Sequence, residues 1–227
     1  MASPPSRART APEHSAAAVR YLAEHGYDTT TAGDLADTVG ISRSTFFRRY
    51  GNKDDVIFAD HVHALAQLEE FLGLTDLTAP DALVDGTCDV LRLLIRNPDS
   101  ARLRFELMRH TPALRDRELI ITHRYERVFA RYIREVMPAG SAQWVPASLS
   151  AGLVAVHNAT LRDWLRGGSA DAVHVLNRDL RQLVSLYQPW LAPESEPASR
   201  RVVVAVYDAA ASPEAVLQAI AATLPAH

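Results

Sequence analysis

The sequence predicts an all-α protein with an N-terminal helix-turn-helix head of three helices, a helical body and a short strand-helix extension at the C-terminal end. Three observations support this class. Apolar residues recur at helical spacing in one segment after another, and prolines or glycines fall between those segments. No β-branched run typical of a strand occurs before residue 201. At 227 residues the chain is long enough to bury a substantial core.

The head begins with a helix expected over residues 12–25, whose apolar stripe ends at Gly26. Thr31 is the expected N-cap of the next helix, since its side-chain oxygen can accept from the first free backbone amides. Asp34 stands where a capping box places Glu or Gln. The start of this second helix is therefore predicted from side-chain chemistry as well as from periodicity.

Two short helical patterns then meet at Gly40, which is the spacing of a helix-turn-helix. Ile41 and Phe46, with Phe47 as a further candidate, would pack the second of these helices onto the first. The outward side of that helix carries hydroxyl and arginine side chains and no acid before Asp54: Ser42, Arg43, Ser44, Thr45, Arg48 and Arg49. Such a surface suits DNA phosphates and base edges, the alternative being a solvated helix face.

The rest of the chain repeats helical segments separated by Pro and Gly. One long helix is expected over 53–73, followed by helices at 80–96, 99–110, 112–137, 145–166 and 170–188. A β-branched run at 201–207, followed by an N-cap at Ser212, predicts a terminal strand and helix. The expected division is a flexible tail over 1–11, a DNA-binding head over 12–55, a ligand-binding and dimerisation body over 56–192, and a linker with extension over 193–227.

Composition limits the possible functions. The net charge of −3 excludes a generally basic nucleic-acid coat, so DNA affinity has to come from a local patch. The single cysteine, Cys88, cannot form an internal disulfide, and no secretory or membrane-spanning apolar run is found, so we expect a cytoplasmic protein without membrane contact.

Chemical motifs are missing from the sequence. No nucleophile motif, P-loop or dinucleotide fingerprint occurs, which predicts that the protein is not an enzyme and needs no cofactor. His61 and His63 are two residues apart, so they lie on different faces of a helix and are poorly spaced to share a metal ion. We expect no metal site.

The first sixty residues resemble the TetR family of bacterial transcriptional regulators. The motifs that carry the resemblance are Gly26-Tyr27, Thr31, Leu35-Ala36, Val39-Gly40-Ile41-Ser42, Thr45, Tyr50 and Lys53. They cover about a quarter of the chain. The resemblance implies an all-α homodimer that binds double-stranded operator DNA through its head and a small-molecule effector through its body, the effector usually releasing the DNA.

By the same resemblance, Thr31 and Lys53 correspond to phosphate contacts, and the recognition-helix residues meet bases or phosphates. The predicted DNA-binding residues are Thr31, Ser42, Arg43, Ser44, Thr45, Phe47, Arg48, Tyr50 and Lys53. Phe47 departs from the tyrosine that many members carry, which removes a hydroxyl able to reach the DNA backbone. Gly33 also lacks the longer side chain that is common there.

In the body, wide apolar faces on the helices at 145–166 and 170–188 predict the homodimer interface, with intramolecular core as the alternative. The faces consist of Leu149, Leu153, Val156, Leu161, Trp164, Val173, Leu176, Leu180, Leu183, Val184 and Tyr187. Large or polar-tipped side chains are the candidates for the effector site: Phe105, Met108, His123, Phe129, Trp144, His157, Asn158 and Trp164. Arg102 and Arg104 could favour an anionic effector, although a solvated helix face is the preferred interpretation.

The sequence thus predicts a repressor that binds a roughly palindromic operator as a homodimer and is released by an effector. The alternative is a helical interaction protein whose head has lost specific DNA binding, a hypothesis suggested by Phe47.

Overall fold

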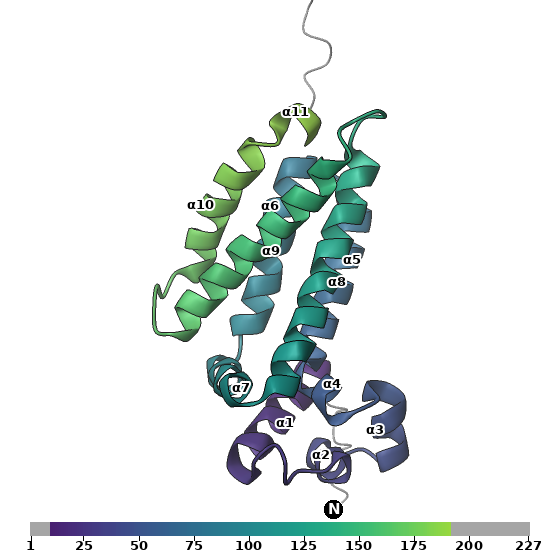
Figure 1. The fold of residues 1–227 in the computed structure, drawn as a ribbon, viewed down its shortest axis with the longest axis vertical. Helices are drawn as coiled ribbons and strands as arrows, with labels where there is room; N and C mark the ends of the chain where they lie inside the picture. The colour runs from purple at the N-terminus through teal and green to yellow at the C-terminus, as the bar shows by residue number, and fades with distance from the viewer. Residues whose placement is uncertain (1–9, 192–227) are drawn as a thin grey trace, which may run out of the picture. The chain divides into compact units, whose positions relative to one another are not determined.

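The computed structural model describes residues 10–191, and every regular element in this range is a helix (Figure 1). The all-α prediction is confirmed for this part of the chain. The predicted strand at 201–207, the helix after it and most of the predicted tail lie outside the described residues. Eleven helices are found between residues 10 and 191: α1 (Ala11–His25), α2 (Ala32–Val39), α3 (Arg43–Tyr50), α4 (Lys53–Ile57), α5 (Ala59–Leu74), α6 (Ala79–Ile95), α7 (Pro98–His110), α8 (Pro112–Val136), α9 (Trp144–Leu165), α10 (Ala172–Ser185) and α11 (Gln188–Leu191).

The helices α1, α2 and α3 form the predicted helix-turn-helix unit. Thr31 caps α2 and forms the predicted capping box with Asp34. Gly40 makes the turn in the left-handed region at φ 77°, a conformation that costs glycine little. The side chains of Leu22, Leu35 and Phe46 are fully buried where the three helices meet. Local capping and a shared apolar centre therefore both fix the angle between α2 and α3.

The predicted single helix over 53–73 is wrong, because the chain breaks at Phe58 into α4 and α5. Ser15 of α1 donates its hydroxyl to the carbonyl oxygen of Ile57 at 2.6 Å. The backbone amide of His61 donates a hydrogen bond to the side-chain carboxylate of Asp60 at 2.9 Å. These contacts divert backbone groups that a continuous helix would pair internally, and Phe58 turns into the core with 1% of its surface exposed.

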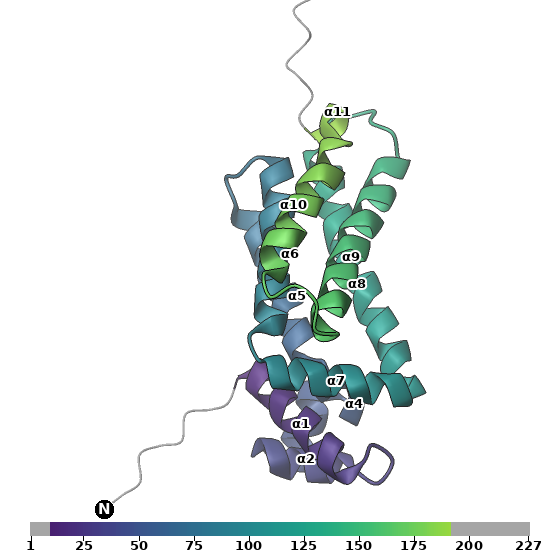
Figure 2. The ribbon, with the colours of Figure 1, turned by 90° about the vertical axis from the view of Figure 1, so that its left-hand side faces the viewer.

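The long helices of the body lie side by side, with α10 packed against both α6 and α9, and α8 against α9 (Figures 1 and 2). The short α7 runs across them in Figure 2 and contacts α1, α8 and α9. Fully buried side chains line the helix contacts, among them Leu83, Leu91, Leu149 and Leu153. Through α7, the body therefore meets the first helix of the head.

Two further predictions need correction. The helix expected over 170–188 ends at Ser185, and α11 follows as a separate turn. Six residues of the predicted dimer surface are buried inside the single chain and belong to its own core: Leu149, Leu153, Trp164, Leu176, Leu180 and Val184. The other five, Val156, Leu161, Val173, Leu183 and Tyr187, are partly exposed.

Candidate DNA-binding surface and body cavity

The outer face of α3 is open and cationic. Arg43, Ser44, Phe47 and Arg48 are exposed there, and the Phe47 side chain has 42% of its surface exposed. Phe47 therefore does not help to pack α3 onto α2, whereas Phe46 does. The guanidinium of Arg43 lies 5.7 Å from the centre of the Phe47 ring, within the range of a cation–π contact. The aromatic ring thus orients an arginine at the surface.

No carboxylate between residues 10 and 191 lies within ion-pair distance of Arg43, Arg48 or Arg49. Arg49 instead lies over the Tyr50 ring at 5.4 Å. Three exposed cations without internal counter-ions create a local positive potential on a chain that is acidic overall. Such a patch attracts a polyanion.

The hydroxyl residues at the start of α3 have a structural role as well. Ser42 is the N-cap and accepts the backbone amide of Thr45 at 3.2 Å. Its own hydroxyl lies 2.9 Å from that of Thr45 and 3.1 Å from that of Ser44. Ser44 is exposed and Thr45 is partly exposed, so both remain on the outer side of the helix.

Thr31 and Lys53, predicted as phosphate contacts, are both engaged within the head. The Thr31 hydroxyl donates to the Asp34 carboxylate at 2.7 Å. The Lys53 ammonium donates to the carbonyl oxygens of Tyr27 at 2.8 Å and Thr30 at 3.3 Å, and lies 3.8 Å from the centre of the Tyr27 ring. Both side chains therefore hold the loop between α1 and α2.

Tyr50 points inward, with 8% of its surface exposed. Its hydroxyl contacts Nδ1 of His14 on α1, and burial raises the pKa of the phenol. The ring also packs edge-on against Phe46. Tyr50 thus fixes α3 to α1, and its position gives no support to the predicted contact with DNA.

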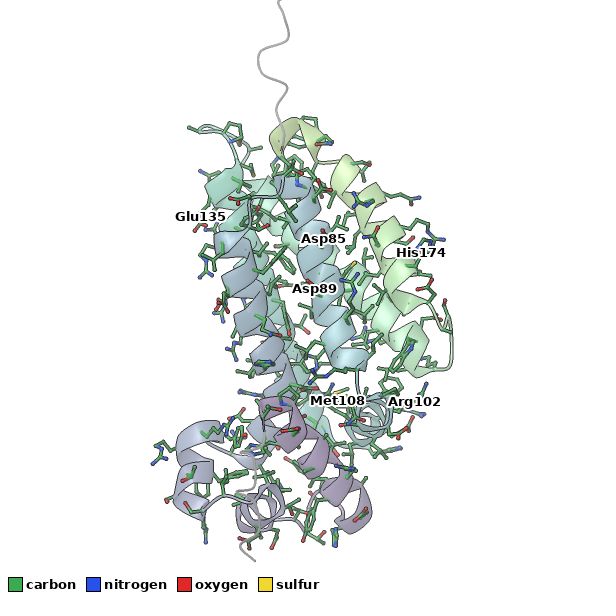
Figure 3. The ribbon with its side chains drawn as sticks, turned by 180° about the vertical axis from the view of Figure 1, so that it is seen from behind. Asp85, Asp89, Arg102, Met108, Glu135 and His174 are labelled. Carbon is green, nitrogen blue, oxygen red and sulfur yellow. The ribbon has the colours of Figure 1, made fainter. Side chains whose placement is uncertain are left out.

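The body contains a cavity of about 50 Å³ between α5, α6, α7, α8 and α9. Five of the residues predicted for effector binding line it: Phe105, Met108, Phe129, His157 and Asn158. Figure 3 shows Met108 on α7, the helix that passes from the cavity to α1. Five of the eight residues that the sequence suggested for effector binding therefore line one cavity.

Three of the residues predicted for effector binding lie elsewhere. His123 is exposed on α8 and faces Glu126 at 3.0 Å. Trp144 is 56% exposed and packs against Trp190 near the end of the described chain. Trp164 is buried under the guanidinium of Arg102, at 5.0 Å, and does not line the cavity. Size and polarity alone do not tell which side of a helix such residues occupy.

The opposite wall, which the sequence reasoning missed, comes from the break between α4 and α5. Phe58 and His61 line the cavity, and Tyr125 faces them and donates its hydroxyl to the carbonyl oxygen of His61 at 2.9 Å. Burial and the nearby charge of Arg104 lower the pKa of His61 to about 3, so this imidazole is neutral. His61 shares α5 with several other polar residues, so no signal in the sequence singled it out.

Arg104 also lines the cavity and is 4% exposed, so the preferred interpretation of a solvated side chain is wrong. Its guanidinium donates to both carboxylate oxygens of Asp60, at 2.6 and 2.7 Å, and to the carbonyl oxygen of Ile57 at 3.3 Å. Burial would raise the pKa of Asp60, but the charge and hydrogen bonds of Arg104 hold that pKa below its ordinary value. Because Asp60 also lies 3.3 Å from Ser15 of α1, one ion pair joins α5, α7 and the head.

The described part of the chain offers neither a metal site nor a membrane span. Among residues 10–191 no three His, Cys, Asp or Glu side chains are grouped to hold a metal ion. Within the same range no helix combines the length and the apolar composition that a membrane crossing requires.

Comparison with known proteins agrees with this architecture. Residues 16–59 match the family model for bacterial regulatory proteins of the tetR family, and residues 77–188 match the model for the MftR C-terminal domain. Together the two models cover well over half of the chain.

Two curated relatives are transcriptional regulators by name. MftR of Mycobacterium tuberculosis, named for regulation of mycofactocin biosynthesis, is 26% identical over 178 residues, which are 75% of this chain and 87% of that protein. The HTH-type transcriptional repressor AcnR of Corynebacterium jeikeium is 32% identical over 78 residues, 34% of this chain and 36% of that protein.

The fold is also shared with a solved regulator. The structure of FadR from Bacillus subtilis, in complex with stearoyl-CoA, matches with a TM-score of 0.54 at 21% identity, covering 76% of this chain and 96% of that one. At this identity the likeness concerns the fold alone. The paired family models, the curated relatives and the helix-turn-helix geometry show that the chain belongs to the TetR family of transcriptional regulators and carries an MftR-like C-terminal domain.

Proposed function

We propose that the protein is a one-component repressor, which binds a roughly palindromic double-stranded operator as a homodimer and is released by a small-molecule effector in the body cavity. The observation that carries the proposal is the position of the cavity. Phe58 and Arg104 form part of its wall, and both belong to the junction that joins the body to α1 and α4 of the head. A ligand that moves this wall can therefore change the position of the head.

The DNA-binding surface is the outer face of α3. Arg43, Ser44, Thr45, Phe47 and Arg48 are presented there, suited to contacts with phosphates, base edges and the thymine methyl group. Ser42, Thr31, Lys53 and Tyr50 are better explained as residues that hold α3 and its neighbouring loops in place. Phosphate anchoring would then depend mainly on the arginines.

The homodimer would form through α9 and α10, and this proposal rests on what remains exposed on these helices. Ala147, Ala151, Ala155 and Ala159 follow one another at four-residue spacing along the exposed side of α9. Small side chains there would allow the same helix of a second copy to approach closely. A two-fold dimer places two α3 helices in major grooves about 34–36 Å apart, or a multiple of it, which requires a palindromic site.

These proposed roles in DNA binding and dimerisation divide the chain into a DNA-binding head over 12–55 and a ligand-binding and dimerisation body over 56–192. Repression, rather than activation, is favoured because AcnR and one further relative, from Mycobacterium tuberculosis, are named repressors.

A gel-shift titration tests the DNA-binding part. The full-length protein is mixed with DNA from the region upstream of its own gene and with a scrambled duplex of equal length. We expect specific, salt-sensitive binding in which the Arg43→Ala/Thr45→Ala variant loses sequence preference. Arg131→Ala is the matched control, because Arg131 is an exposed arginine of α8 in the body. Equal binding of both duplexes by the wild-type protein would contradict the proposal and favour a head without specific DNA binding.

A further inference from the structure

We infer that the body cavity takes an uncharged, mainly apolar effector that donates a hydrogen bond to Nε2 of His157. The inference rests on the proposed function, since it specifies the ligand of the proposed effector site. It follows from the charges of the cavity wall, from the hydrogen bonds of one buried imidazole and from the apolar character of the remaining surface.

Charged groups in the wall are already paired. Arg104 is bound by Asp60 on both carboxylate oxygens, and the guanidinium of Arg162 lies 3.9 Å from the Glu118 carboxylate. An anionic or cationic ligand would have to compete with these pairs, or be buried without a counter-ion, which is costly in a low dielectric. The wall therefore selects against charge.

The rest of the wall is aromatic and aliphatic, with Phe105, Phe129, Val154 and Leu161 among its members. Such a surface gains free energy from apolar contact and provides few polar anchors. The specificity of the site thus depends on the few polar atoms that face it.

His157 is one of the polar residues in the wall. The residue is 7% exposed, lines the cavity, and its Nδ1 lies 3.1 Å from Oδ1 of Asn158. Because a carboxamide oxygen can only accept, this contact places the proton on Nδ1 and leaves a lone pair on Nε2. That Nε2 has no hydrogen-bond partner among residues 10–191.

The protonation of the ring supports the same conclusion. Burial lowers the pKa of His157, so the imidazole is neutral and Nε2 stays an acceptor at neutral pH. A buried acceptor without a partner costs free energy, which a ligand hydroxyl or N–H would recover. His61, whose Nδ1 is also buried without a partner in the described chain, lines the same cavity and offers a second polar contact.

The test uses phenol as an uncharged donor, toluene as a probe of similar size without the donor, and benzoate as an anion. Binding to the full-length protein is measured by calorimetry. In parallel, NMR of protein labelled with ¹⁵N-histidine reports which ring nitrogen of His157 carries the proton. We expect the proton on Nδ1, a shift of the Nε2 resonance on adding phenol, and phenol binding about tenfold tighter than toluene. Benzoate should bind more weakly than either probe.

His157→Phe removes the acceptor but keeps a ring of similar size, so the preference for phenol over toluene should fall to about one. This variant removes an unpaired buried acceptor and should fold at least as stably as the wild type, which circular dichroism checks. His123→Phe makes the same change at an exposed position of α8 and should keep the tenfold preference. A proton on Nε2, equal affinity for phenol and toluene, tighter binding of benzoate, or no phenol binding would each overturn the inference.

The outcome can be separated from the fate of the proposed function. The gel-shift titration needs no ligand, so loss of operator binding contradicts the proposed function whatever the cavity binds. Conversely, a preference for phenol that depends on His157 establishes the cavity chemistry even if phenol leaves operator binding unchanged.

Discussion

The buried pair Arg104–Asp60 gives a sharp prediction about stability. Replacing Arg104 with Met keeps most of the apolar stem but leaves the Asp60 carboxylate buried without its cation. The two side chains are 5% and 13% exposed, and the guanidinium contacts both carboxylate oxygens. Breaking a buried pair from one side costs about 3–5 kcal/mol, and we expect about 3 kcal/mol here because Asp60 retains some contact with solvent.

The double variant Arg104→Met/Asp60→Asn should recover most of this loss. An asparagine keeps an acceptor for the amide of His61, and the carbonyl oxygen of Ile57 keeps its bond from the hydroxyl of Ser15. With both charges removed, no buried ion is left unpaired, and the remaining cost should be about 1 kcal/mol.

Urea unfolding at fixed protein concentration, followed by circular dichroism, measures these differences. The exposed pair Arg131–Glu69, at 3.3 Å, is the matched control, and Arg131→Met should change the free energy of unfolding by less than about 0.5 kcal/mol. If Arg104→Met alone is as mild as the control, or if the double variant is no more stable than Arg104→Met, the pair does not hold the junction.

Three further predictions concern stability and operator binding. The folded-state pKa of His61, about 3, and that of His157 lie below the ordinary 6.5, so the unfolded chain takes up more protons as the pH falls. Urea unfolding should show a loss of stability between pH 7 and pH 5.5, with about 1 kcal/mol from His61 and a loss in the same direction from His157; a flat profile would contradict neutral burial. Gly86→Ala should destabilise the protein by about 1–3 kcal/mol, because the added Cβ would lie 2.9 Å from a leucine methyl group of α5. Gly73→Ala, where the added Cβ meets open space, should stabilise the protein by up to about 1 kcal/mol. Thermal unfolding compares the two variants, and equal effects would refute the packing argument. Tyr50→Phe removes the hydroxyl contact to His14 of α1 and should lower the free energy of unfolding by about 1 kcal/mol. A gel shift should show that the affinity for the operator is unchanged. A weaker affinity in the folded variant would indicate that Tyr50 does contact DNA.

Local features of the fold could be predicted because local chemistry determines them. Thr31, Asp34 and Gly40 set the bounds of α2 through capping and a left-handed turn, interactions that span only a few residues. The outer face of α3 was also predictable, since a short helix whose apolar side is known has its polar side determined. Tyr50 was not, because the histidine that binds its hydroxyl lies 36 residues earlier in the chain.

The break at Phe58 shows why the junction lay beyond sequence reasoning. Periodicity continues through residues 53–73, yet α5 starts afresh because Ser15 and Arg104 take the carbonyl oxygen of Ile57 out of the helical ladder. Those partners are 42 and 47 residues away, so no local pattern could indicate them.

The same distant contacts connect the wall of the cavity to the head. Arg104 lines the cavity on one side and is held by Asp60 on the other, and Asp60 is within reach of Ser15 on α1. At about 50 Å³ the cavity is far smaller than the usual effector site of about 300–1,000 Å³, so an effector of ordinary size has to move wall side chains. Movement of Phe58 or Arg104 changes the contacts that fix the start of α5 against α1. Under the proposed function, occupancy of the cavity would reach α3 through these contacts, which is the physical requirement for coupling between the two sites.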